Sequence, residues 1–409
     1  DTQRLVLVIF YLSLSSMNYL VYDFSKKYKE AKVLVKDDLK RGFLIRSIHV
    51  GSAFALSSLL GSNALANNDF DDYKSSMSAG LFSVEDEFAQ YKKAYAKAYQ
   101  DYQDEISQFW SEVELSDSKT WVDYNSAMDV KRVFDFSKNE IRISVQGHKL
   151  ESFTPADTER EILKALNLGL AKAYRIDPVL AKIVGGQEPL SQRKIMAADK
   201  SLAAPLAKVA LLQRKAGKKG DLLIITAKLP KDSLSQRAGT FLPSVRKSAD
   251  KWQVPAPLIM AIMHTESAFN PLARSHIPAF GLMQIVPKSA GRDASRLVFG
   301  EERLLVGSDL FEPDTNIEMG AAYLHLLDTQ YLKGITDSAS RQICVIAAYN
   351  TGAGNVARAF TGTSSIKKAL PLINRLSSQQ VYAHLRSKLK HEEARNYIKK
   401  VTEILPRYR

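Results

Sequence analysis

The sequence of 409 residues predicts an α+β protein, in which a mixed α/β amino-terminal domain, residues 67–238, precedes a mainly α-helical domain, residues 239–409. Three observations support this fold class. Aromatic side chains recur at steps of three and four residues between Phe88 and Trp110, as they do along an amphipathic helix. Apolar and polar side chains alternate within residues 130–145, as in a hairpin. From about Gln236 onward, nearly every apolar pattern has the helical period.

The amino-terminal domain is expected to combine one long helix with several strands. We interpret the aromatic stripe of this helix as core, and it comprises Phe88, Tyr91, Tyr95, Tyr99, Tyr102, Ile106 and Trp110. Val133–Phe136 and Ile141–Val145 flank a Ser-Lys-Asn turn and predict a hairpin. Leu222–Leu229 is rich in branched residues and predicts another strand. The basic stretch Arg214–Lys219 before it is expected to be a solvated loop.

Residues 1–66 are interpreted as an upstream segment followed by a signal peptide. Lys36–Arg46 supplies the positive region, Ile48–Leu60 the short apolar region, and Ala64–Ala66 the pattern of a cleavage site. We therefore expect export to the periplasm. The earlier apolar run, Leu5–Leu14, is too short to span a bilayer, which requires about 20 residues.

The chain carries a formal net charge of +13. Nine basic and five acidic side chains in residues 1–66 contribute +4, which leaves +9 for the rest. A cationic surface favours anionic partners, and on charge alone these include peptidoglycan, nucleic acid and anionic lipid. No nucleic-acid-binding motif is present, and export argues against nucleic acid, so peptidoglycan and anionic lipid stay open as partners of a chain that we expect to be a monomer.

Glu266 closes an apolar helical run that starts at Pro257. On a helix, Ile259, Ile262 and Glu266 fall on one face, so the carboxyl shares a stripe with core side chains. Burial of a carboxyl disfavours its charged form and raises its pKa, which suits a general acid near neutral pH. The alternative is a solvated glutamate at the edge of an amphipathic helix, because structural carboxylates outnumber catalytic ones.

Two glycine-bearing turns follow this helix. In the first, Gly281 would let the backbone approach a ligand, and Met283 and Gln284 would offer an apolar contact and an amide. The second ends a predicted buried helix, where Tyr349 and Asn350 form a polar pair suited to the wall of a cleft. The alternative for that pair is a helix C-cap without further function.

The sequence shows no motif that would indicate a metal or a nucleotide cofactor. The seven histidines lack the paired spacing of metal ligands, and His264 is expected to be an ordinary packed or exposed residue. Gly352 and Gly354 are not followed by a third glycine at dinucleotide-binding spacing. The one cysteine, Cys344, is expected to be a small buried residue. We predict no cofactor and no metal.

Five blocks in order resemble the lytic transglycosylase domain of the soluble-lytic-transglycosylase type, which has a lysozyme-like fold. They are Glu266–Ser267, Gly281–Gln284, Pro313–Leu324, Ala348–Gly354 and Glu393–Ile398. The resemblance runs from about Leu242 to Arg409. Upstream, Lys119–Tyr124 and Val130–Val145 resemble the amino-terminal domain of the membrane-bound lytic murein transglycosylase C family.

The resemblance implies specific roles for residues of this chain. Glu266 would be the sole catalytic acid and base, and the substrate-binding residues would be Ser275, Met283, Gln284, Tyr349, Asn350 and Tyr397. The implied reaction cleaves the bond between N-acetylmuramic acid and N-acetylglucosamine in peptidoglycan and closes a 1,6-anhydro ring. It also implies association with the outer membrane, although no cysteine stands at the predicted cleavage site. Arg274–Pro278 departs from the family by replacing a more polar stretch.

Two other functions stay open at this point. A goose-lysozyme-like muramidase would use water instead of ring closure, and it would become plausible if Asp293, Asp309 or Asp314 approached Glu266. A catalytically inactive scaffold that binds the cell wall is the second alternative. Product analysis separates the first from a transglycosylase, and a Glu266→Gln variant tests the second.

Overall fold

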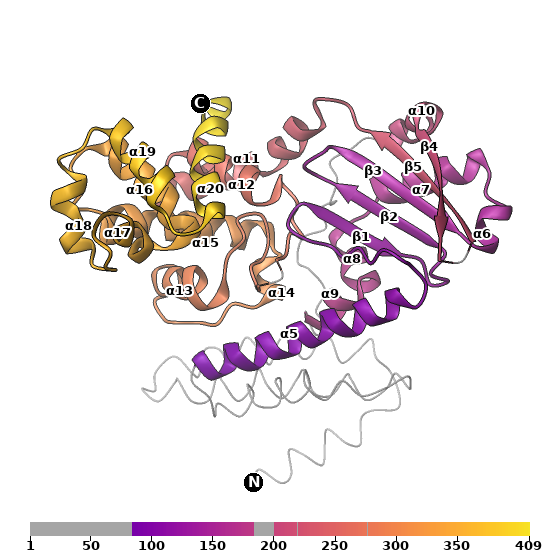
Figure 1. Cartoon of the computed structure of the whole chain (residues 1–409), viewed down its shortest axis with the longest axis horizontal. Helices are drawn as coiled ribbons and strands as arrows, with labels where there is room; N and C mark the ends of the chain where they lie inside the picture. The colour runs from indigo at the N-terminus through magenta and orange to yellow at the C-terminus, as the bar shows by residue number, and fades with distance from the viewer. Residues whose placement is uncertain (1–83, 184–199, 219, 276) are drawn as a thin grey trace, which may run out of the picture. The chain divides into compact units, whose positions relative to one another are not determined.

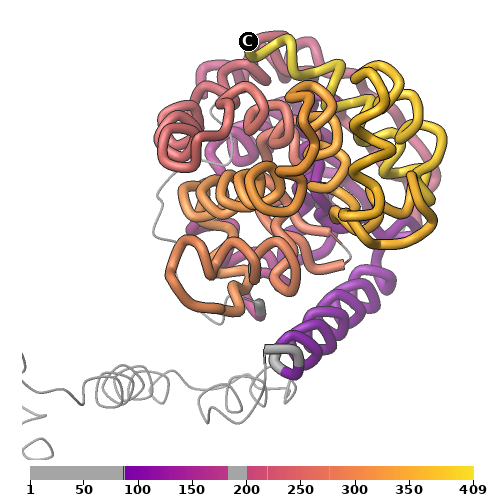
Figure 2. The backbone as a smooth tube through the Cα atoms, turned by 90° about the vertical axis from the view of Figure 1, so that its left-hand side faces the viewer, coloured from indigo at the N-terminus to yellow at the C-terminus, as the bar shows by residue number. Residues whose placement is uncertain are grey.

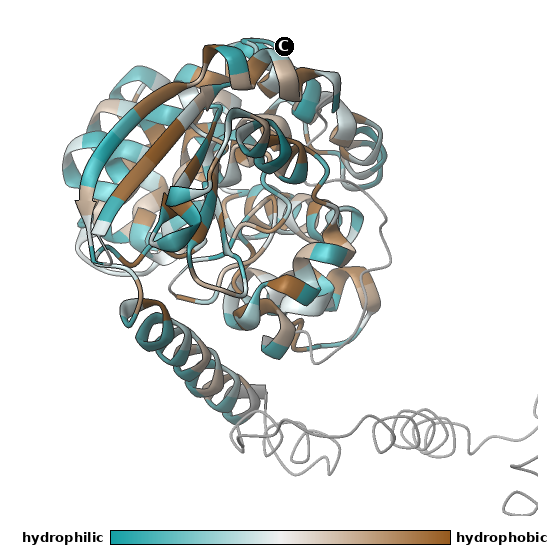
Figure 3. Ribbon diagram, turned by 90° about the vertical axis from the view of Figure 1, so that its right-hand side faces the viewer, coloured by the Kyte–Doolittle hydropathy of each residue, from teal (hydrophilic) through white to brown (hydrophobic). Residues whose placement is uncertain are grey.

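The computed structural model describes residues 84–183, 200–218, 220–275 and 277–409. All of them belong to the second of two compact units, Asn68–Arg409. The predicted signal peptide lies outside the described residues. The first described element, helix α5 (Val84–Ser107), buries the predicted stripe from Phe88 to Ile106, and Trp110 is buried just beyond its end, so the stripe is confirmed as core. In Figure 3 this helix is mainly hydrophilic in colour, with paler bands between the hydrophilic residues.

A five-stranded antiparallel sheet follows in the order β1-β2-β3-β5-β4 (Figure 1). Its strands are β1 (Thr120–Tyr124), β2 (Val130–Asp135), β3 (Glu140–Gln146), β4 (Leu211–Gly217) and β5 (Gly220–Lys228). The predicted hairpin is confirmed, since Val133 pairs with Arg142 across β2 and β3. Asn139 adopts a left-handed φ of 54° in its turn, which an asparagine tolerates well.

The predicted solvated loop at Arg214–Lys219 is wrong for its first part. Arg214 to Gly217 belong to β4, and Arg214 pairs with Leu223 of β5. The side chains of β4 are nevertheless almost all exposed. Basic side chains are common on edge strands because charge opposes pairing with another chain. The polar composition of this segment is therefore that of an edge strand. From the sequence alone, the same composition was interpreted as a loop.

Short helices pack around the sheet. They are α6 (His148–Glu151), α7 (Pro155–Leu166), α8 (Leu170–Ile176), α9 (Pro178–Ile183) and α10 (Ala203–Val209), and α7 and α10 contact both each other and the sheet (Figure 1). Helix α7 starts with a capping box, in which Thr154 and Asp157 satisfy each other's backbone donors. Arg132 of β2 bonds both Asp123 of β1 and Glu161 of α7, which ties the helix to two strands.

The remainder of the chain is helical, and Figure 2 shows these helices, coloured from rose through orange to yellow, packed side by side. The elements are α11 (Ser233–Trp252), α12 (Ala256–Ser267), η3 (Pro287–Gly291), α13 (Arg292–Phe299), α14 (Gly307–Leu310), α15 (Pro313–Leu326), η4 (Leu327–Tyr331), α16 (Ser338–Thr351), α17 (Ala353–Thr361), α18 (Ile366–Ile373), α19 (Ser378–Lys388), α20 (Glu392–Ile404) and η5 (Leu405–Tyr408). The predicted α+β class, with strands first and helices after them, is confirmed. Of the helices in the described ranges, none is both long and apolar enough to cross a membrane.

Candidate active site

Glu266 lies in the last turn of helix α12. This helix is apolar through most of its length, and Ile259 and Ile262 on the face of Glu266 are fully buried, as the spacing predicts. The helix ends at Ala268, whose left-handed φ of 49° turns the chain away. Helices α11, α15 and α20 all contact α12. Glu266 itself is half-buried, so the fold holds it among core elements without removing it from solvent.

Burial raises the pKa of Glu266 from an ordinary value of 4.5 to about 7. The Tyr397 hydroxyl and the positive charge of Lys119 act in the opposite direction and lower this pKa, while Glu393 raises it. The desolvation effect is the largest of these, so the carboxyl holds its proton well above the usual range of a glutamic acid. It is therefore able to donate a proton and accept one near neutral pH.

Tyr397 of α20 faces this carboxyl. Its ring is buried, and burial together with the charge of Glu266 raises the pKa of its phenol. Although the hydroxyl influences Glu266 as a hydrogen-bonding group, it has no partner at normal hydrogen-bond geometry among the described residues. The hydroxyl therefore keeps its capacity to donate to another group.

The Gly281–Gln284 turn is built around a close backbone approach. Gly281 has a φ of 75°, and a Cβ added there would lie 2.2 Å from the Leu310 carbonyl oxygen. The buried Asn316 side chain donates to the carbonyls of Phe280 and Leu310 at 2.7 and 2.8 Å, and it accepts from the Met283 amide at 2.8 Å. Glycine is therefore required at this position, and Asn316 fixes the turn from the next helix.

Met283 and Gln284 occupy different environments within this turn. Met283 is fully buried, and its sulfur fills the space that the absent side chain of Gly320 leaves on α15. Gln284 is half-buried, and its amide nitrogen donates to the carbonyls of Ala273 and Gly281 at 3.0 Å each. Both residues therefore support the loop, and the Gln284 amide oxygen is the group left to meet a ligand.

Tyr349 and Asn350 end helix α16, as predicted. The Tyr349 hydroxyl donates to the Met283 carbonyl at 2.8 Å and so joins α16 to the turn. Burial raises the pKa of Tyr349, and the nearby charge of Glu266 raises it further, which places the ring beside the carboxyl. The half-buried amide of Asn350 has no hydrogen-bond partner in the described chain, so it can meet a ligand.

Ser275 is less closely connected to Glu266 than the other predicted residues. Its hydroxyl donates to the Ile277 carbonyl, two residues on, and its own carbonyl accepts from the Tyr95 hydroxyl at 3.0 Å. Across the described residues, no hydrogen bond connects Ser275 with Glu266. The structure therefore gathers Glu266, Tyr349 and Tyr397 at one place and leaves Ser275 in a loop held by helix α5.

The three aspartates considered for a hydrolytic mechanism have other partners. Asp293 accepts from the Tyr331 hydroxyl, Asp309 caps a short helix through the Val306 amide, and Asp314 accepts from the Ser244 hydroxyl. Asp314 also lies in the first turn of α15. The carboxylate that does act on the pKa of Glu266 is Glu393 of α20.

Sequence reasoning missed Lys119 and Asn316 as parts of this site. The Lys119 ammonium donates to the Thr265 carbonyl in the last turn of α12, although the two residues are 146 positions apart. Each residue stands in a block that resembles the family, but neither block indicates by itself what the side chain contacts. In the described ranges, no group of three or more His, Cys, Asp or Glu side chains could hold a metal ion.

Comparison with known proteins decides the family. The model of the transglycosylase SLT domain matches residues 243–370. Membrane-bound lytic murein transglycosylase C of Histophilus somni (strain 2336) is 32% identical over 365 residues, which cover 85% of this chain and 93% of that protein. The chain belongs to the membrane-bound lytic murein transglycosylase C family. It is therefore a lytic transglycosylase, a lyase that acts on peptidoglycan.

Other members and structures match a part of the chain. Membrane-bound lytic murein transglycosylase C of Sodalis glossinidius is 43% identical over 185 residues, 45% of this chain and 51% of that protein. The lytic transglycosylase Slt of Pseudomonas aeruginosa is 28% identical, with a TM-score of 0.32, over 41% of this chain and 23% of that one. The 70 kDa soluble lytic transglycosylase of Escherichia coli is 25% identical, with a TM-score of 0.33, over 44% and 25%.

Proposed function

We propose that this chain cleaves the β-1,4 bond between N-acetylmuramic acid and N-acetylglucosamine, with Glu266 as the single acid and base. The observation that carries the proposal is the half-buried Glu266 carboxyl, whose pKa of about 7 allows both protonation states near neutral pH. Tyr349 and Tyr397 lie beside it, and Asn350 ends the helix that carries Tyr349. General acid and base catalysis works best when the group's pKa is near the working pH.

The reaction follows in two steps. Glu266 first donates its proton to the glycosidic oxygen, and that bond breaks while the 2-acetamido group of the muramoyl unit stabilises the positive charge at C1. The Glu266 carboxylate then removes the proton of the C6 hydroxyl, whose oxygen bonds to C1 and closes the 1,6-anhydro ring. The carboxyl is regenerated without water. The substrate supplies the nucleophile that a second carboxylate supplies in ordinary retaining glycosidases.

The neighbouring side chains have supporting roles in this scheme. Tyr397 would donate a hydrogen bond to the Glu266 carboxylate when it forms, because its hydroxyl has no regular partner among the described residues. Asn350 and the Gln284 amide oxygen would contact the sugar acetamido and hydroxyl groups. Met283 would act through packing beneath the turn, and Ser275 would contact substrate only if its hydroxyl left the Ile277 carbonyl.

We place the protein in the cell envelope as a monomer that acts on peptidoglycan strands. Relatives that carry the name membrane-bound support that location. The predicted signal peptide, periplasmic export and outer-membrane association remain predictions of the sequence, because they concern residues outside the described ranges.

Digestion of purified sacculi, followed by mass spectrometry of the released fragments, tests this function. The wild-type chain should release muropeptides that end in 1,6-anhydro-N-acetylmuramic acid, and Glu266→Gln should release almost none. Reducing muramic acid ends would instead support a muramidase, in which Glu393 would be the carboxylate to examine as the activator of water. Equal release by wild type and Glu266→Gln would favour the inactive scaffold.

A further inference from the structure

Lys119, immediately before strand β1, reaches from the sheet to the end of the catalytic helix. Its ammonium donates to the Thr265 carbonyl, and to the His264 carbonyl at 3.4 Å. The Lys119 backbone is itself fixed, since its amide donates to the Asp117 carboxylate at 2.6 Å and its carbonyl accepts from Phe136 at 2.9 Å. The final carbonyls of a helix carry partial negative charge, so a cation is favoured there.

The charge of Lys119 also reaches Glu266, the next residue along α12. After burial, the main influences on the pKa of Glu266 are Tyr397 and Glu393 from α20 and Lys119 from the sheet side, and Lys119 is the positive charge among them. Burial lowers the pKa of Lys119 to about 8, although Glu266 acts to raise it, and Lys400 lowers it further. The two groups therefore influence each other near the working pH.

We propose that Lys119 is a positioning residue of the active site, which fixes the last turn of α12 and places a positive charge beside Glu266. The proposal rests on the proposed role of Glu266. The sheet side thereby contributes to the active site through Glu266. The positive charge favours the carboxylate that forms after proton donation, and the bonds to the two carbonyls keep the carboxyl oriented.

Three substitutions in the full chain separate the charge from the hydrogen bonds. Lys119→Arg keeps both, Lys119→Gln keeps a donor without charge, and Lys119→Met removes both. Without the charge, the pKa of Glu266 should rise, because a nearby cation favours the carboxylate. The alkaline limb of the pH profile of anhydromuropeptide release should therefore move upward by about one pH unit in Lys119→Gln and Lys119→Met. Lys119→Arg should leave the limb in place.

A purely structural role gives a different pattern. If Lys119→Gln and Lys119→Met lower the melting temperature or the rate but leave the limb where it is in wild type, the proposal is overturned. Should Lys119→Met fail to fold, Lys119→Gln alone decides the outcome. Glu266→Gln is measured in parallel. If this variant kept its activity, the proposed function would be rejected, and the failure would not concern Lys119.

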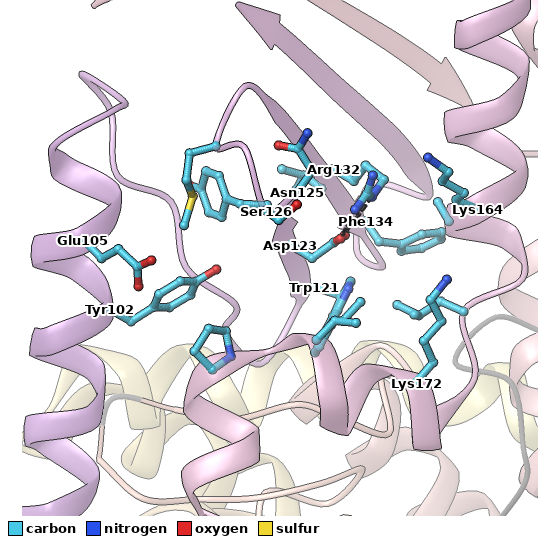
Figure 4. Close-up of a pocket in the computed structure, with 17 residues that line it drawn as sticks. Tyr102, Glu105, Trp121, Asp123, Asn125, Ser126, Arg132, Phe134, Lys164 and Lys172 are labelled. Carbon is cyan, nitrogen blue, oxygen red and sulfur yellow. Dashed lines mark hydrogen bonds and ion pairs between the residues drawn. The ribbon is translucent and has the colours of Figure 1, made fainter. Parts of the chain in front are cut away.

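An independent observation is a cavity of about 530 Å³ between helix α5 and the first strands (Figure 4). Its lining residues include Tyr102, Glu105, Trp121, Asn125, Lys164 and Lys172. Small-molecule sites commonly have volumes of about 300–1,000 Å³. Figure 4 shows Tyr102 and Glu105 on one side, and Lys164 and Lys172 on the other.

The floor and the rim of this cavity differ in character. Tyr102, Trp121, Tyr124 and Phe134 are almost completely buried, so their rings form a floor and offer no open platform for a sugar. The Tyr102 side chain is 5% exposed, its hydroxyl points into the cavity in Figure 4, and it has no hydrogen-bond partner in the described residues. A hydroxyl that faces a cavity can donate a hydrogen bond to a ligand bound there, or accept one from it.

The rim carries free charges of opposite sign. Glu105 and Lys172 are exposed, and neither forms an ion pair with any residue the structure describes. Lys164, in contrast, bonds Glu161 at 2.6 Å. A ligand that spans the cavity would therefore meet an acid at one side and a base at the other, which complements a zwitterion.

We infer that this cavity binds a short zwitterionic peptide, of the kind that forms the stems of peptidoglycan. The inference rests on peptidoglycan as the substrate. A stem carboxylate would lie near Lys172, and a stem ammonium near Glu105. The site would then hold the peptide of a strand while Glu266 acts on the glycan.

Calorimetry on the full-length Glu266→Gln chain tests this inference without turnover. The probes are a stem tetrapeptide that contains diaminopimelic acid and a peptide-free glycan tetrasaccharide. The tetrapeptide should bind, and Lys172→Glu should weaken it at least tenfold, whereas the control Lys208→Glu on the exposed face of α10 should not. Tyr102→Phe should weaken it several-fold. Absence of tetrapeptide binding, or binding that Lys172→Glu leaves unchanged, would overturn the inference, and either result leaves the test of catalysis by Glu266 intact.

Discussion

Two sides of the candidate active site differ in how their polar groups are used. On one side, the Gly281–Gln284 turn has its polar groups bonded within the protein, through Asn316, Tyr349 and the Gln284 amide nitrogen. On the other side, Glu266 and Tyr397 face each other without a closed hydrogen bond. Bonded groups hold a shape, whereas open groups can bind and transfer protons. Substitutions in the turn should therefore reduce stability, and substitutions beside the acid should reduce activity.

The largest effect is expected at Glu266. Glu266→Gln keeps the size of the side chain but removes the proton that the first step requires. We expect the rate of anhydromuropeptide release to fall by about a thousandfold or more. Melting curves should show a fold at least as stable as wild type, since a neutral amide replaces a carboxyl that is costly to ionise. If Glu266→Gln lost both its activity and its fold, the expected contrast between substitutions beside the acid and substitutions in the turn would be contradicted.

The next effect is expected in the turn. In Gly281→Ala the added Cβ meets backbone at 2.2 Å in a left-handed conformation, so the free energy of unfolding should fall by about 3 kcal/mol. Gly300→Ala is the matched control, because Gly300 has a similar φ of 76° with nothing within 4 Å of the added atom. It should lose only about 1 kcal/mol. Equal losses in urea titrations of the two variants would show that contact with Leu310 is unimportant.

A pH-dependent effect should come next in size. The pKa of Glu266 is raised in the folded chain, so its contribution to stability is complete below the unfolded value of 4.5 and is lost as pH rises through about 7. Wild type should therefore lose about 2 kcal/mol of stability relative to Glu266→Gln between pH 4.5 and 8. Denaturant unfolding of both chains across this range measures it. A constant difference would mean that the carboxyl is not desolvated.

The smallest effects compare two tyrosines. Tyr349→Phe removes a hydrogen bond to the Met283 carbonyl and should cost about 1 kcal/mol of stability. Tyr397→Phe removes a hydroxyl that has no regular partner in the described residues, so stability should change little while activity falls several-fold. Thermal melts and rates measured on the same samples provide the check. If the two variants exchanged these outcomes, our assignment of bonded and open sides would be reversed.

Much of the site was predictable because its signals are local. The period that places Ile259, Ile262 and Glu266 on one face depends on neighbouring residues alone, and the structure confirms it. The stripe along α5 and the hairpin of β2 and β3 were predictable for the same reason.

The remaining features depend on contacts between distant residues. Met283 is buried because Gly320, 37 positions later, leaves room for its sulfur, and nothing around Met283 reveals that space. Lys119 reaches Thr265 only because the sheet packs near the end of α12. Part of the exposed strand β4 was interpreted as a loop because its composition is polar. It is a strand because it pairs with β5, and that pairing cannot be read from the composition of β4.

We propose that one carboxyl cleaves the glycan without water, and digestion of sacculi in water enriched in oxygen-18 tests this proposal. We expect fragments that end in 1,6-anhydromuramic acid and contain no added oxygen-18. Newly released reducing muramic acid ends, with heavy oxygen at C1, would contradict it, because cleavage leaves a reducing end only when water attacks the sugar.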